Sequence, residues 1–62
     1  MKYTIAIHTN DNIYFHEIES KQDRDQIQDN IRYLLQTKNI LEIKHTLYNM
    51  TLVSRVDVEE VT

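Results

Sequence analysis

The chain contains no cysteine, no glycine, no proline and no tryptophan. Without cysteine it can form neither a disulfide framework nor a thiolate metal site, and this absence suits a reducing cytoplasm. Without glycine it can build neither a glycine-rich phosphate loop nor the G-x-S-x-G turn of a serine hydrolase. Its turns must therefore be formed by Asn, Asp, Ser and Thr, which hydrogen-bond to nearby backbone groups.

Basic residues and long apolar runs are also scarce. Seven Lys and Arg against ten Asp and Glu give a formal charge of −3, which argues against nucleic acid as the partner because phosphate contacts supply most of that affinity. No apolar run approaches the roughly 20 residues that a membrane span needs. The first residues lack the apolar region and cleavage site of a signal peptide. We therefore expect a cytoplasmic chain without a membrane association.

One segment, residues 20–38, has the pattern of an amphipathic helix. Ser20 and Asp23 resemble an N-cap and the acidic half of a capping box. Four apolar residues then recur on one side of a 3.6-residue helix: Ile27, Ile31, Leu34 and Leu35. Because this helix has a single apolar stripe, it must pack against another element. Asn39 is a plausible left-handed stop after it.

Residues 2–8 and 13–19 alternate between polar and apolar side chains, which predicts two half-buried strands. A turn at Asn10-Asp11-Asn12 would join them, and we expect Ile7 to lie opposite Phe15. That register places five apolar residues on one face: Tyr3, Ile5, Ile7, Ile13 and Phe15.

Residues 41–47 and 52–58 predict a second hairpin around a turn at 48–51, with Leu47 opposite Leu52 and Leu41 opposite Val58. The end of the chain either continues this last strand or forms a turn and a short terminal strand. The chain is too short for a second core, so we expect a single domain spanning residues 1–62. The predicted fold is α+β in the order β-β-α-β-β, an antiparallel four-stranded sheet with one amphipathic helix packed on one face.

No catalytic or cofactor motif is present, so the sequence predicts neither an enzyme nor a cofactor. In the expected register His8 and His16 are diagonal neighbours on one face. Two partly exposed strand histidines are the favoured interpretation, and a transition metal held by both imidazoles and by ligands from a partner chain is the alternative. His45 is expected on the helix side, as a hydrogen-bonded residue at the edge of the core. Asp25 and Asp29 form an acidic helix face; a solvated surface is the simpler interpretation, and a basic protein partner is the alternative.

The sheet face away from the helix is more apolar and aromatic than a solvated face requires. Its expected interaction residues are Tyr14, Ile18, Ile40, Thr46, Tyr48 and Val53, with Thr4 and Ala6 beside them. Surface residues without a role are one interpretation. A homodimer interface is the favoured one, because it would enlarge a small core. Docking of a different protein, or base stacking on the tyrosines beside Lys44 and Arg55, are the others.

In overall pattern, the chain resembles small uncharacterised proteins encoded by phages and prophages of Gram-positive bacteria. The resemblance covers the strand pair KYTIAIHTNDNIYFHEIES, the short amphipathic helix and the segment ending VDVEEVT. It implies a non-enzymatic protein that binds and redirects a host factor, such as a defence enzyme, in the host cytoplasm. The alternatives are a small nucleic-acid-associated regulator and a structural accessory domain.

Overall fold

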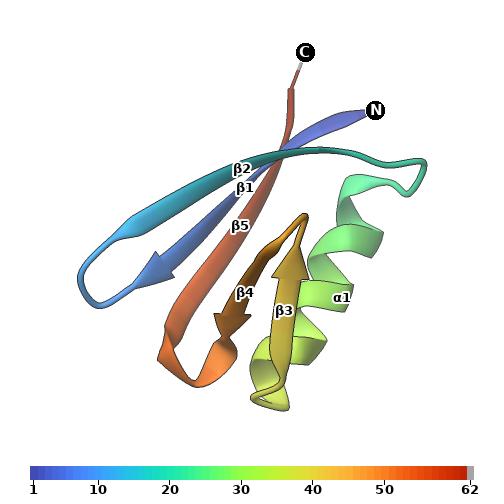
Figure 1. Cartoon of the computed structure of the whole chain (residues 1–62). Coiled ribbons are helices and arrows are strands. Elements are labelled where there is room, and N and C mark those ends of the chain that lie inside the picture. Colours follow the sequence, from blue (N-terminus) through green and yellow to red (C-terminus); the bar gives the residue numbers. More distant parts are fainter. Residues whose placement is uncertain (62) are drawn as a thin grey trace.

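The computed structural model describes residues 1–61. The elements follow in the order β1 (Lys2–Thr9), β2 (Ile13–Glu19), α1 (Arg24–Gln36), β3 (Ile40–Ile43), β4 (Thr46–Asn49), a short 3₁₀ helix η1 (Met50–Leu52) and β5 (Val53–Val61). The predicted α+β class with one helix is confirmed. The predicted single four-stranded sheet is wrong, because the strands form a three-stranded sheet, β2-β1-β5, and a separate two-stranded sheet, β3-β4 (Figure 1).

The last strand pairs with the first strand and not with the preceding hairpin. β5 runs antiparallel to β1, with Val58 opposite Ile5 and Val56 opposite Ile7. The segment expected to be one strand, residues 41–47, instead turns at Lys44 and His45, so that β3 and β4 pair with each other. The expected pairs of Leu47 with Leu52 and of Leu41 with Val58 are therefore absent. β5 continues to Val61 as one strand, which settles the alternative left open for this end of the chain.

The core lies between the three-stranded sheet and a layer formed by α1 and the β3–β4 hairpin, which lie side by side (Figure 1). β1 and β5 contribute alternate residues from one face, which we call the core face of the sheet. The buried apolar residues are Tyr3, Ile5, Ile7, Ile27, Ile31, Leu41, Ile43, Met50, Val53, Val56 and Val58. The opposite, outer face of the sheet is open to solvent, so Phe15 on it is 68% exposed.

The N-cap of the helix lies three residues later than the predicted Ser20. Asp23 is the N-cap: its carboxylate accepts from the backbone N–H of Gln26 at 2.9 Å, and the Gln26 side chain accepts from the backbone N–H of Asp23 at 3.1 Å. This is a complete capping box, which satisfies two backbone donors at once. Ser20 instead accepts from the backbone N–H of Gln22 in the preceding loop, so its predicted capping role is wrong.

Two lysines adopt left-handed backbone conformations that glycine normally supplies. Lys38 (φ 57°) follows α1 and Lys44 (φ 56°) lies in the β3–β4 turn. A side chain with a Cβ atom costs roughly 1 kcal/mol in this region, and a chain without glycine must accept that cost where it turns sharply. The left-handed stop predicted at Asn39 is therefore one residue too late.

The first hairpin has the predicted strands but a register that differs by one residue. Ile7 lies opposite Tyr14, and Ala6 lies opposite Phe15. Because side chains alternate between faces, this shift moves every residue of β2 to the other side of the sheet. Ile13 and Phe15, which were expected in the core, lie on the outer face. Tyr14, His16 and Ile18 lie on the core face.

Candidate functional site

Two tyrosines that are far apart in the chain meet where β4 crosses the core face of β2. The ring centroids of Tyr14 and Tyr48 are 5.9 Å apart, with a tilt of 53° between the planes. His16 lies edge-on to Tyr48, with centroids 5.5 Å apart, and its Nε2 is hydrogen-bonded to the Tyr48 hydroxyl. Tilted and edge-on aromatic contacts are the favoured geometries, so the β3–β4 hairpin is held against β2 by this group of rings.

A hollow of about 470 Å³ lies beside these rings. We call it the tyrosine groove; its lining residues are Thr9, Tyr14, Thr46, Leu47, Tyr48, Asn49, Leu52 and Val53. None of them carries a formal charge. Leu47 and Leu52 are 65% and 68% exposed, and Tyr14 is 43% exposed. The groove therefore presents aliphatic and aromatic surface to solvent, together with hydroxyl and amide groups.

The 3₁₀ turn η1 sets the position of one wall of this groove. The Asn49 side-chain oxygen accepts from the backbone N–H of Thr51 at 3.1 Å and from its hydroxyl at 2.7 Å. Met50 is fully buried, and its backbone N–H donates to the Asn39 carbonyl at 3.2 Å. With Met50 anchored in the core, Leu52 is left at the rim of the groove.

Burial raises the pKa of the Tyr48 hydroxyl above its usual value of 10.0, and the nearby Tyr14 hydroxyl raises it further. A neutral phenol is therefore maintained well above physiological pH. Such a group can donate or accept a hydrogen bond, while its ring provides apolar contact. The arrangement is suited to holding an uncharged group of mixed apolar and hydrogen-bonding character.

No protein-family model, curated protein or solved structure matches this chain. Among residues 1–61, no helix is both long enough and apolar enough to cross a membrane.

The structure brings together four of the six residues predicted to form an interaction surface. Tyr14, Thr46, Tyr48 and Val53 line the tyrosine groove, although Val53 is largely buried. The expectation that these side chains point away from the helix side is wrong for Tyr14 and Ile18, because the hairpin register places both on the core face. It is also wrong for Val53, which is part of the buried core.

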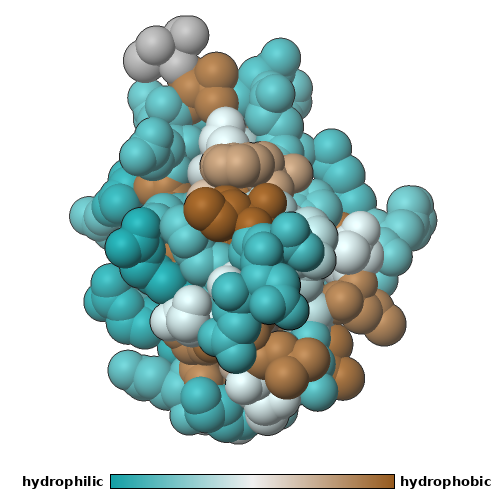
Figure 2. Space-filling model, turned by 90° about the vertical axis from the view of Figure 1, so that its left-hand side faces the viewer, coloured by the Kyte–Doolittle hydropathy of each residue, from teal (hydrophilic) through white to brown (hydrophobic). Residues whose placement is uncertain are grey.

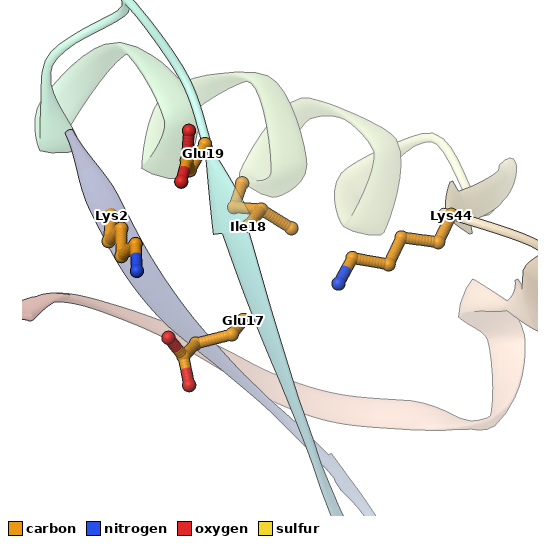
Figure 3. Close-up of a pocket in the computed structure, with 5 residues that line it drawn as sticks. All are labelled: Lys2, Glu17, Ile18, Glu19 and Lys44. Atoms are coloured by element: carbon orange, nitrogen blue, oxygen red, sulfur yellow. The ribbon is translucent and has the colours of Figure 1, made fainter.

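The other two predicted residues lie elsewhere. Ile40 is exposed at the start of β3. Ile18 is half-buried against the core and lines a second hollow, of about 370 Å³, between β2 and the Lys44 side chain (Figure 3). Sequence reasoning missed Leu47 and Leu52 as surface residues, since both were expected to pair inside a core. Their only signal was their apolar character on either side of the segment 48–51.

The histidines do not form the arrangement expected from the sequence. His8 lies on the outer face, where its Nε2 is 3.1 Å from the Asp57 carboxylate, whereas His16 lies on the core face. The expectation that these two side chains share a face is therefore wrong. His45 is exposed in the β3–β4 turn, so the expectation of a hydrogen-bonded residue at the edge of the core is wrong. No three His, Asp or Glu side chains within residues 1–61 are grouped as a metal site would require.

The acidic helix face consists of solvated carboxylates. The side chains of Asp25 and Asp29 are 87% and 73% exposed. Arg32 lies 3.8 Å from Asp29, as their i, i+3 spacing along the helix predicts. Arg24 pairs with the adjacent Asp25 at 3.2 Å. Exposed ion pairs of this kind contribute little to stability.

Proposed function

We propose that this chain is a non-enzymatic binding protein that holds an apolar segment of a protein partner in the tyrosine groove. The observation that carries the proposal is the uncharged lining of the groove, with two exposed leucines beside a pair of tyrosines. Exposed apolar surface of this kind is typical of interaction sites. Tyrosine is also enriched among the residues that dominate binding energy.

The lining defines the chemistry of the partner segment. A charged side chain entering the groove would lose hydration without meeting an opposite charge, which is unfavourable. An aliphatic or aromatic side chain would cover Leu47 and Leu52 and release water from them. The Tyr14 hydroxyl would pair with a polar backbone group of the same segment, whereas the Tyr48 hydroxyl is already bonded to His16 and Tyr48 contributes its ring.

The resemblance to phage-encoded proteins supports a host protein as this partner, met in the host cytoplasm. The nucleic-acid alternative has weaker support. Arg55 lies on the outer face, where its guanidinium is held 2.9 Å from the Asp57 carboxylate. Tyr14 lies on the core face, and Tyr48 of β4 packs against it there. The two basic residues expected to contact phosphates therefore do not converge with the rings, since Lys44 lies in the β3–β4 turn.

The proposal is tested by affinity capture from a Gram-positive bacterial lysate, with and without nuclease. The informative comparison uses the double variant Leu47→Ser/Leu52→Ser. Both positions are largely exposed, so the fold should be retained. Tyr33→Ser is the matched control, because Tyr33 is 62% exposed on α1 and does not line the groove. The proposal expects one protein to be retained by the natural chain and the control, in both nuclease conditions, and lost by the double variant.

The captured protein is then purified and its affinity measured by calorimetry. Each leucine buried on binding contributes about 1–2 kcal/mol, so the double variant should weaken binding by roughly 30-fold or more. Equal affinity of the double variant would show that the partner binds elsewhere. Capture that disappears with nuclease would favour the nucleic-acid alternative.

A further inference from the structure

The two edge strands of the three-stranded sheet, β5 and β2, differ in whether side chains of α1 are hydrogen-bonded to their backbone. Along β5, α1 covers the edge with side chains: Arg24 Nε donates to the Val58 carbonyl at 2.6 Å, and Gln28 Nε2 donates to the Val56 carbonyl at 2.9 Å. These bonds occupy backbone acceptors that a further strand would use. β2 forms the other edge of the sheet, and no helix side chain is hydrogen-bonded to its backbone in residues 1–61.

The hydrogen bonds at the two ends of the first hairpin show which backbone groups of β2 face outward. Met1 and Ser20 exchange two bonds, of 3.0 and 2.9 Å. At the other end, the Thr9 N–H donates to the Asn12 carbonyl at 2.9 Å. Hydrogen-bonded and non-hydrogen-bonded residue pairs alternate along an antiparallel ladder. The bonded pairs Met1–Ser20 and Thr9–Asn12 fit the same alternation. The backbone groups that point away from β1 therefore belong to Ile13, Phe15, Glu17 and Glu19.

β2 also lacks most of the features that normally protect an edge strand. Such strands are usually short, bulged, or marked by proline or by charged side chains, lysine above all. β2 is seven residues long, contains neither lysine nor proline, and pairs with β1 without a register shift. Its charged residues, Glu17 and Glu19, both follow Phe15 in the strand. Its outward-facing residues include Ile13 and Phe15, which are 51% and 68% exposed. Figure 2 shows small hydrophobic patches set among hydrophilic residues on one side of the molecule.

We infer that two copies of this chain pair through antiparallel β2 strands, with the two-fold axis at Phe15. Phe15 then faces its counterpart, and Ile13 lies opposite Glu17 of the second copy. This register brings the four exposed apolar side chains together. A two-fold axis at Glu17 would instead place two carboxylates opposite each other, which is unfavourable. The result is a continuous six-stranded sheet built from two three-stranded sheets.

The pairing uses the strand edge, whereas the tyrosine groove lies on the core face, so the two proposals fail independently. The contact is centred on one strand and two exposed apolar residues per copy. It is therefore smaller than the roughly 1,200 Å² of a stable interface, and we expect a dissociation constant on the order of 100 μM. Because each copy carries a charge of −3, salt should strengthen the dimer by screening the repulsion.

Sedimentation velocity over concentrations below and above this dissociation constant tests the inference. The natural chain should shift from monomer to dimer, and more so at higher salt. Phe15→Lys places two positive charges at the axis and should weaken dimerisation by at least about tenfold. Tyr33→Lys makes the same change in charge at an exposed site on α1 and should dimerise normally. Circular dichroism checks that both variants are folded.

Amide hydrogen exchange locates the contact. At high concentration the N–H groups of Ile13, Phe15 and Glu17 should exchange more slowly, and in Phe15→Lys they should not. A chain that stays monomeric at all concentrations overturns the inference, as does a dimer that persists in Phe15→Lys. If these amides are protected only by a different protein, the edge accepts that protein's strand and the two-copy inference is wrong.

Discussion

The substitution Met50→Ala should remove a large part of the stability of this chain. Met50 lies in the 3₁₀ turn η1 and is fully buried between the sheet and the helix layer. Replacing a buried methionine by alanine loses its transfer free energy and leaves a cavity, together about 2–5 kcal/mol. A chain of 62 residues has a total stability of about 3–9 kcal/mol. The expected loss is therefore about a fifth of the total or more.

The measurement is urea unfolding followed by circular dichroism. With a slope of about 1 kcal/mol per molar urea for a small chain, the midpoint should fall by at least about 2 M, or the variant should be partly unfolded in buffer. Leu52→Ala is the matched control, because Leu52 lies in the same turn and is 68% exposed; it should change stability by no more than about 0.5 kcal/mol. Equal losses for the two variants would refute the placement of this turn.

Three further predictions concern the N-cap of α1, the ionisation of Tyr3 and the β5 edge that α1 covers. Asp23→Ala should lower the free energy of unfolding by about 1 kcal/mol, whereas Ser20→Ala should change it little. A larger loss for Ser20→Ala than for Asp23→Ala in urea unfolding would show that Ser20 is the N-cap. Burial, followed by the charges of Glu60 and Asp23, raises the pKa of Tyr3 in the folded chain. The neutral Tyr3 side chain therefore makes its full contribution to stability below pH 10, and this contribution declines as the pH rises further. In Tyr3→Phe the melting temperature should fall less steeply with increasing alkaline pH. Arg24→Ala should cost about 1 kcal/mol and speed amide exchange in β5, and unchanged exchange would argue against the bond to the Val58 carbonyl.

Local patterns predicted the helix and the first two strands. Alternation along residues 2–8 and 13–19 identified the first two strands, whose bounds in the structure are Lys2–Thr9 and Ile13–Glu19. The apolar spacing of Ile27 and Ile31 identified the helix and its buried face. These features follow from side-chain periodicity within a few residues, so they are readable without knowledge of the rest of the chain.

The register of the first hairpin could not be predicted from side-chain periodicity. The hydrophobicity of Phe15 favoured a place in the core, whereas in the structure Phe15 is exposed. The difference is one residue in the turn, where the Thr9 N–H donates to the Asn12 carbonyl. On the core face, Tyr14 and His16 both contact Tyr48 of a distant strand. The alternation of residues within β2 cannot predict this contact.

The candidate site was only partly predictable, because it also depends on contacts between segments that are distant in the chain. Tyr14 and Tyr48 were identified as interaction residues from their chemistry, and they do line one groove. Leu47 and Leu52 were assigned to a core pair because the turn was placed at 48–51 instead of at Lys44 and His45. A turn without glycine or proline carries a weak signal, and the left-handed conformation of Lys44 is not indicated by its residue type.

By itself, the sequence determined the α+β class, the single helix, the strands of the first hairpin and the absence of thiol and glycine-loop chemistry. Those properties depend on composition and on short-range periodicity. Only the tertiary structure decided that β5 pairs with β1, that the sheet divides into three and two strands, and that β2 is left as an open edge. These outcomes depend on which apolar faces bury each other across long stretches of chain, and many pairings satisfy the same local pattern until the whole core is assembled.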